Sequence, residues 1–292
     1  MKIIITISII ACVLILQSFN DTKPAYKLFD KNGKETNYSE MLKMAKDADI
    51  VFFGELHNNP ISHWLQYELT KDLHKEKEGK IILGAEMFES DNQLIMNEYL
   101  KGTIAESKFE DEARLWPNYS TDYKPLVSFA KENNLAFIAT NIPRRYASVV
   151  FNKGFEGLES LDDEAKRFIA PLPVDYDENL DCYKNMMKMG GMGKGMGKTN
   201  ENFPKSQAIK DATMAHFITK NHKENYISIH YNGSYHSDNY QGIVWYVKNK
   251  NKKLKIFTIT TVTQAELDKL SDEYINMADF IIVVPETMTT TY

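Results

Sequence analysis

Six short segments of the sequence are almost continuously apolar and rich in β-branched or aromatic residues. They span residues 49–53, 80–85, 135–139, 226–230, 254–259 and 278–284. Runs of this kind are typical of strands buried on both faces, as in a parallel sheet covered by helices. Amphipathic stretches at helical spacing, such as 60–73 and 205–221, lie between them. This alternation predicts an α/β fold with an open, mostly parallel sheet flanked by helices.

Start signals precede several of the expected helices. Asn59 and Pro60 supply an N-cap and a proline at the first helical position. Ile61, Trp64, Leu65, Leu69 and Leu73 then form one apolar face. Two capping boxes and one acidic cap are expected at later helix starts: Ser90 with Gln93, Thr103 with Glu106, and Asp122.

The third and fourth of these segments are separated by a long stretch without a clear strand. A helix is expected over 160–170, ended by Pro171 and Pro173, and residues 186–198 are a low-complexity run of Met, Gly and Lys. Loops of such length inside a domain usually carry structure or function of their own. We therefore expect residues 141–225 to form a helical insertion or lid that contains a mobile loop.

The first residues are typical of an export signal. Lys2 precedes an apolar run from Ile3 to Leu16, which is shorter than the ~20 residues of a membrane span. Residues 1–20 are therefore predicted to be a signal peptide, followed by a single domain over 21–292. Cys12 ends a lipobox-like tetrapeptide, so lipidation there and an ordinary cleavage near Ser18 to Asp21 are both open. The protein is expected in the periplasm or anchored as a lipoprotein of the cell envelope.

Composition adds two exclusions. The net charge of −5 and a pI of about 5.9 give no indication of a nucleic-acid partner. Of the two cysteines, only Cys182 remains after residue 20, so the mature chain has no internal disulfide.

Charged and polar side chains follow four of the expected strands. In open α/β sheets, ligands bind outside the carboxyl ends of the strands. These ends meet at one edge, so the residues there are expected to form one site. The set comprises Glu55, His57, Glu86, Arg144, Arg145 and His236.

Two of these turns share the pattern Gly-x-x-His, at Gly54 to His57 and Gly233 to His236. Glycine permits the tight or left-handed turn that leaves a strand. One such pattern is weak, but two that each follow a buried strand indicate paired histidines over the sheet edge.

Each of these residues also has a purely structural interpretation. Glu55 and Glu86 are acceptable helix caps, His57 is acceptable as a packing residue, and His236 as an exposed loop residue. Arg144 and Arg145 stand at a helix start, where a cation opposes the helix dipole. At least one of the two arginines is therefore expected to pair with Glu55 or Glu86, or with an anionic ligand.

At this point the sequence resembles the ChaN-type haem-binding proteins, within a superfamily that includes Tiki-like proteases and erythromycin esterases. Five motifs carry the resemblance over roughly residues 45–285. They are GELH at 54–57, GAEMF at 84–88, NIPRR at 141–145, QAIKDATMA at 207–215 and GSYH at 233–236.

The resemblance implies an iron-regulated lipoprotein of haem uptake, with an outer-membrane haem receptor as a partner and a pocket that can form between two subunits. In the family a tyrosine ligates the iron and a histidine lies near the propionates. Tyr183, Tyr226, Tyr231 and Tyr235 are expected near the site, with Tyr183 assigned to the ligand pocket beside Arg144 and the histidines. Phenolate ligation suits ferric iron.

The same residues support a competing hypothesis. In the enzyme branches of the superfamily, positions like these serve metal binding or general-base chemistry. His57, Glu86 and His236 would hold a divalent metal ion with an open position for water. Without metal, a His–Glu pair drawn from Glu55, His57, Glu86 and His236 would activate water directly. This hypothesis makes the protein a periplasmic esterase or peptidase.

Overall fold

The computed structural model describes residues 23–190 and 200–292. These residues form a seven-stranded sheet whose spatial order is β1-β7-β6-β2-β5-β3-β4. All neighbouring strands are parallel except β1, which pairs antiparallel with β7 at one edge. The strands are β1 Lys27–Asp30, β2 Ile50–Glu55, β3 Ile81–Glu89, β4 Phe137–Asn141, β5 Ile227–Gly233, β6 Ile256–Gln264 and β7 Phe280–Pro285.

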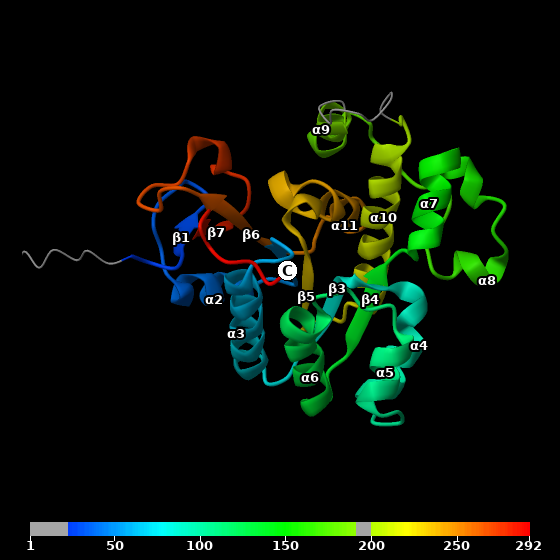
Figure 1. Cartoon of the computed structure of the whole chain (residues 1–292), viewed down its shortest axis with the longest axis horizontal. Helices are drawn as coiled ribbons and strands as arrows, with labels where there is room; N and C mark the ends of the chain where they lie inside the picture. The colour runs from blue at the N-terminus through cyan, green and yellow to red at the C-terminus, as the bar shows by residue number, and fades with distance from the viewer. Residues whose placement is uncertain (1–22, 191–199) are drawn as a thin grey trace, which may run out of the picture.

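Helices cover both faces of this sheet (Figure 1). One face packs against α2 Tyr38–Lys46, α3 Pro60–Glu76, α4 Gln93–Leu100, α5 Glu106–Glu112 and α6 Lys124–Glu132. The other packs against α7 Arg144–Lys153, α10 Phe203–Asn221 and α11 Ile243–Lys250. The short α8 Asp163–Lys166 and α9 Asp181–Gly190 lie between α7 and α10 in the chain.

Strand β2 shows why a parallel sheet needs two helical layers. Successive side chains of a strand point to opposite faces. Val51 and Phe53 belong to the core under α3 and α6, whereas Ile50 and Phe52 belong to the core under α10 and α11. All four are fully buried, so no polar alternation is left in the strand.

The predicted α/β fold is confirmed, and each of the six predicted strands overlaps an observed one. Strand β1 is missed by the sequence analysis. It has four residues with two buried side chains, so its apolar run is too short to stand out. The predicted helix over 160–170 is reduced to the single turn of α8.

The cap at Asn59 is confirmed, since its side chain accepts a hydrogen bond from the Ser62 amide at 3.0 Å. The other three caps are wrong. Ser90 donates to the Phe168 carbonyl instead, and α5 follows Ala105 without a side-chain cap. Asp122 lies inside a π-helical turn, Tyr119–Tyr123, before α6 begins. Distant tertiary partners outcompete local capping at Ser90 and Asp122.

Between β4 and β5, the described residues form helices and loops but no strand. Of these, α10 packs on β4, α7 and α11 and so belongs to the layer covering the sheet. A separate insertion over 141–225 stays a prediction. The predicted signal peptide with Cys12, and residues 191–199 of the predicted Met/Gly loop, lie outside the described residues. Within 23–190 and 200–292, no helix has the length and apolar character needed to cross a membrane.

Candidate functional site

The centre of the sheet has a topological switch point. Strands β2 and β5 are neighbours, and Glu55 pairs in register with Gly233 at their carboxyl ends. The chain leaves β2 toward α3 on one face and leaves β5 toward α11 on the other. Where the connections after two neighbouring strands leave toward opposite faces of the sheet, a crevice opens between them. This crevice is the usual ligand position in open α/β sheets. The two Gly-x-x-His turns lie on either side of it.

Glu55, at the end of β2, is a buried carboxylate with three donors. His57 Nδ1 lies 2.9 Å from Oε1, and the Tyr123 hydroxyl donates to the same oxygen at 2.7 Å. Gln66 Nε2 donates to Oε2 at 2.6 Å. A buried carboxylate needs such a complete set of partners. The arrangement orients the His57 ring so that Nδ1 faces Glu55.

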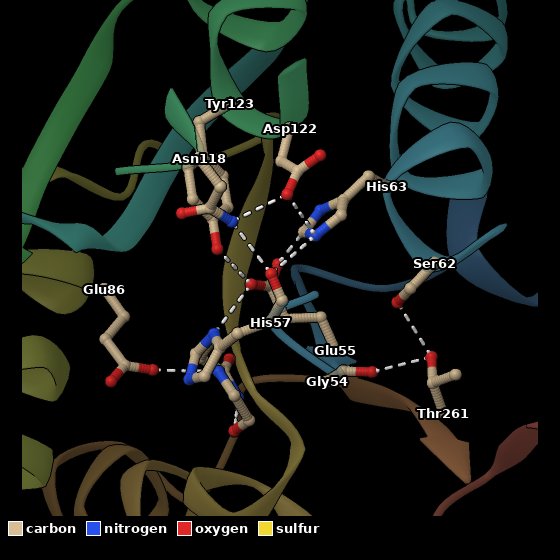
Figure 2. A network of polar contacts seen from close by, with 12 residues as sticks. Gly54, Glu55, His57, Ser62, His63, Glu86, Asn118, Asp122, Tyr123 and Thr261 are labelled. Atoms are coloured by element: carbon tan, nitrogen blue, oxygen red, sulfur yellow. Dashed lines mark hydrogen bonds and ion pairs between the residues drawn. The ribbon is translucent and has the colours of Figure 1, made fainter. Parts of the chain in front are cut away.

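The backbone carbonyl of His57 is fixed by polar contacts in addition to those of its ring (Figure 2). Its carbonyl oxygen accepts from Asn118 Nδ2 at 2.9 Å and lies 3.1 Å from His63 Nε2. Asp122 in turn accepts from Asn118 at 2.6 Å and lies 3.5 Å from His63. The Trp116 ring packs edge-on against the imidazole, 4.9 Å between centroids. His57 therefore has a defined orientation in a partly open position.

The surroundings of His57 favour its protonated form. Burial, the largest single effect, lowers its pKa. The hydrogen bond to Glu55 and the negative charges of Glu86 and Glu55 together outweigh burial, so the pKa of His57 lies above its usual 6.5.

His236 lies between two carboxylates. Nδ1 is 2.5 Å from Asp211 Oδ1, and Nε2 is 3.3 Å from Glu86 Oε1. Glu86 Oε2 also accepts from the Gly233 amide at 2.8 Å, and Asp211 Oδ2 accepts from the Tyr183 hydroxyl at 2.8 Å. Burial lowers the pKa of His236, but the charges of Glu86 and Asp211 raise it to about 10. Burial favours a neutral Glu86, yet the His236 charge holds the pKa of Glu86 well below its usual range.

The two glycines of the Gly-x-x-His turns are needed for close approach. A Cβ on Gly233 would lie 2.7 Å from His57 Nε2, and one on Gly54 would lie 2.9 Å from the Ser234 Cα. Neither glycine is among those with positive φ. Of the two turns considered from the sequence, tight or left-handed, the left-handed one is therefore not adopted. The glycines let the two turns pack against one another.

Two cavities meet at these histidines. The first has a volume of about 770 Å³ and the second about 340 Å³, and His57 and His236 line both. The first is mainly apolar, with Leu56, Met186, Phe203, Tyr235 and Tyr292 in its wall. The second is polar, with Glu86, Glu89, Asn141, Arg144 and Lys210 among its lining residues.

The two arginines have different surroundings. Arg145 Nη1 pairs with Asp91 at 2.6 Å. The exposed side chain of Arg144 makes no ion pair or hydrogen bond with the described residues, and it lines the second cavity. Lys210, which donates to Gln207 at 3.2 Å, lines the same cavity. Arg144 and Lys210 thus present positive charge to the cavity's contents.

Two assignments made from the sequence are corrected here. Tyr183 is 1% exposed, bonded to Asp211, and lines neither cavity at the histidines, so its hydroxyl is not available to a ligand there. The metal site of His57, Glu86 and His236 is not supported either. In the described parts of the chain, no group of three or more His, Cys, Asp or Glu residues is placed to hold a metal ion.

Several residues of the site were not identified from the sequence. Gln66, Tyr123 and Asp211 complete the two histidine–carboxylate pairs, and Lys210 adds a cation. Asp211 and Lys210 lie in the QAIKDATMA segment already noted, so the motif itself was an available signal. No sequence signal pointed to Gln66 or Tyr123. Gln66 lies within α3 and Tyr123 in the π-helical turn, and neither adjoins a strand end in the sequence.

The family model for haem-binding uptake, Tiki superfamily, ChaN, matches residues 41–247. The chain belongs to this family. The resemblance inferred from the five motifs is thereby confirmed, and the matched range contains both histidine–carboxylate pairs.

Structural comparison agrees on the fold. ChaN of Campylobacter jejuni, described with cofacial heme binding, is 16% identical, with a TM-score of 0.68 over 89% of this chain and 96% of that one. A succinoglycan biosynthesis protein is 10% identical with a TM-score of 0.50, over 87% of this chain and 94% of that one. Protein RETICULATA-RELATED 5, chloroplastic, of Arabidopsis thaliana is 27% identical over 131 residues. These are 43% of this chain, and the match spans only 18% of that relative's length.

Proposed function

We propose that this chain binds haem as cargo in haem or iron acquisition, across the two cavities that meet at His57 and His236. The observation that carries the proposal is this junction of an apolar cavity with a polar one that Arg144 and Lys210 line. Haem has the matching form, a flat apolar macrocycle with two anionic propionates at one edge. Membership of a haem-binding uptake family supports the same ligand.

The lining residues fit such a ligand. The apolar cavity's volume of about 770 Å³ is within the range of small-molecule sites, roughly 300–1,000 Å³. Leu56, Met186 and Phe203 supply apolar contact area for the macrocycle. Arg144 and Lys210 would receive the propionates, as charge-assisted hydrogen-bond donors.

The same proposal includes export of the chain, its pairing with a second copy and the source of its haem. The sequence of residues 1–20 supports export, and Cys12 supports anchoring as a lipoprotein of the cell envelope. Tyr235 and Tyr292, exposed by 37% and 60%, lie at the apolar cavity and offer surface to a second copy of the chain. Haem would then come from an outer-membrane receptor.

A metal-free hydrolase is the second candidate. The observation that favours it is the pair of histidine–carboxylate contacts at one crevice, Glu55 with His57 and Glu86 with His236. A histidine oriented by a carboxylate can accept a proton from water in ester or peptide hydrolysis.

Titration of the full chain with haemin, followed by visible absorption, tests the proposal. We expect a saturable Soret shift near one haem per chain, weakened at least about tenfold in His57→Ala and His236→Ala. His222→Ala is the matched control, since His222 lines a cavity at the opposite end of the strands with Asp49 and Tyr226. An absent shift, or one that both site variants leave unchanged, would refute haem binding here and direct the work to esterase and peptidase substrates.

A further inference from the structure

The segment that follows β7, residues 286–292, returns across the sheet to the ligand site. The Glu286 amide donates to the Gln264 carbonyl at 3.1 Å, at the carboxyl end of β6. Further along, the Thr291 amide donates to the Asn58 carbonyl at 2.9 Å, in the turn after β2. In Figure 1 this red segment crosses from β7 toward the centre of the molecule. It therefore passes the carboxyl ends of β6 and β2, next to the crevice.

The Thr291 side chain is bonded to the polar network that fixes His57. Its hydroxyl donates to Asp122 Oδ2 at 2.7 Å. The same oxygen accepts from Asn118 at 2.6 Å and lies 3.5 Å from His63. Asn118 and His63 also contact the His57 carbonyl, as Figure 2 shows. Asp122 is 3% exposed, so the Thr291 hydroxyl supplies one partner of a buried carboxylate.

The far end of this segment forms part of the apolar cavity's wall, where Asn58 and Tyr292 both line the cavity. Every residue from 286 to 292 is exposed or partly exposed, whereas Val283 and Val284 of β7 are fully buried. Segments with little buried surface open locally while the core stays folded. The two hydrogen bonds of Thr291 hold the far end in place.

We propose that residues 286–292 are a strap that opens and closes the apolar cavity, with Thr291 holding it closed. The inference rests on the proposed function, since haem is the cargo whose passage the strap controls. While Thr291 is bonded, the strap completes the cavity wall and retains the ligand. When these bonds break, the wall opens, and Asn118 and His63 still hold the His57 carbonyl. Opening therefore sets the rates of entry and release without rebuilding the site.

The rate of haemin association, followed by stopped-flow absorption, and the rate of release to excess apomyoglobin test the strap in the full chain. Thr291→Val removes the hydroxyl and keeps a β-branched side chain and the backbone amide. We expect both rates to rise about twofold to tenfold, the effect of losing one hydrogen bond. The Kd should stay nearly unchanged, because the bond is lost from the free and the loaded chain alike.

Thr290→Val is the matched control. The Thr290 hydroxyl donates to the Tyr292 carbonyl at 3.1 Å, within the strap itself, and its removal should leave both rates unchanged. Hydrogen exchange of the chain without haemin measures the opening directly. Peptides that cover 286–292 should exchange faster than those of β7, and faster still in Thr291→Val.

The outcomes separate the strap from the function beneath it. Unchanged rates in Thr291→Val, or faster release with unchanged association, would overturn the strap and leave haem binding intact. Exchange of 286–292 as slow as that of β7 would overturn it as well, because the segment would not open. A chain that takes up no haemin would overturn the proposed function, and with it the strap's part in haem passage.

Discussion

At the scale of single residues, His236 shows how a buried charge is tolerated at a binding site. It is 8% exposed and lies between Glu86 and Asp211, so one positive charge faces two negative ones. Removing one member of such a group leaves an uncompensated buried charge, which is strongly destabilising. The group therefore fixes the shape of the crevice before any ligand arrives.

The pKa values of this group predict how stability depends on pH. The pKa of His236 is raised to about 10, so its stabilising contribution is complete below about 6.5 and is lost as pH rises toward 10. The pKa of Glu86 is lowered, so its contribution is lost as pH falls below its ordinary value of 4.5. We expect the thermal midpoint to be highest between these limits, measured by circular dichroism from pH 4 to 10.

The variant His236→Gln provides the control. It should lower stability by about 3 kcal/mol near neutral pH, the typical effect of breaking a buried ion pair. It should also remove most of the decline between pH 6.5 and 10. An unchanged alkaline decline in His236→Gln would show that other groups cause it.

At the scale of elements, α3 turns a polar stripe toward the site. His63, Gln66 and Thr70 follow one another at three- and four-residue spacing and are buried, whereas Trp64 is 48% exposed. Such residues share one face of a helix. The predicted apolar face of this helix is therefore wrong at Trp64. The buried face of α3 instead carries polar side chains, of which Gln66 hydrogen-bonds to Glu55 and Thr70 to Tyr231.

The start of α3 offers a test at this scale. Asn59 caps the helix and is 4% exposed, two residues after His57. We expect Asn59→Ala to lower the free energy of unfolding by about 1 kcal/mol, through loss of the cap. It should also weaken haemin binding, since the turn that carries His57 loses an anchor. Both effects are measured on one preparation, by urea unfolding and haemin titration.

Asn37→Ala is the matched control, because Asn37 caps α2 in the same way through the Glu40 amide, at 3.1 Å. It should cost a similar free energy of unfolding and leave haemin affinity unchanged. Equal losses of affinity in both variants would mean that general stability, not the position of His57, governs binding.

At the scale of the whole molecule, two local positive charges stand out against a chain of net charge −5. Arg144 and Lys210 come from α7 and α10, at opposite ends of the helical stretch between β4 and β5. They converge on the second cavity.

Replacing both cations tests their role. Arg144→Ala with Lys210→Ala should weaken haemin binding about tenfold or more and reduce its dependence on salt. The free energy of unfolding should change by less than about 1 kcal/mol, because Arg144 is exposed and makes no ion pair or hydrogen bond with any described residue. Arg145→Ala is the control, since Arg145 pairs with Asp91. A loss of affinity confined to Arg145→Ala would assign the anion to the other arginine.

Sequence patterns could predict this fold because buried parallel strands are continuous apolar runs, and these were visible in six of seven strands. Glu55, His57 and His236 could be grouped because each stands at or just after a strand's carboxyl end, and Glu86 because it follows the apolar run at 80–85, although β3 continues to Glu89. Asp211 and Tyr123 could not, since only packing brings α10 and the π-helical turn to the crevice. Tyr183 was misplaced for the same reason, as its sequence position does not show whether its hydroxyl faces inward.

The shared wall of the two cavities has a consequence for selectivity. A molecule that fills only the apolar side gains no contact with Arg144 or Lys210, and a small anion that fills only the other side gains no apolar contact. Only a ligand long enough to extend past His57 and His236 collects both contributions. The crevice is therefore selective for molecular length, and we expect it to bind short fatty acids and inorganic phosphate more weakly than a ligand that fills both cavities.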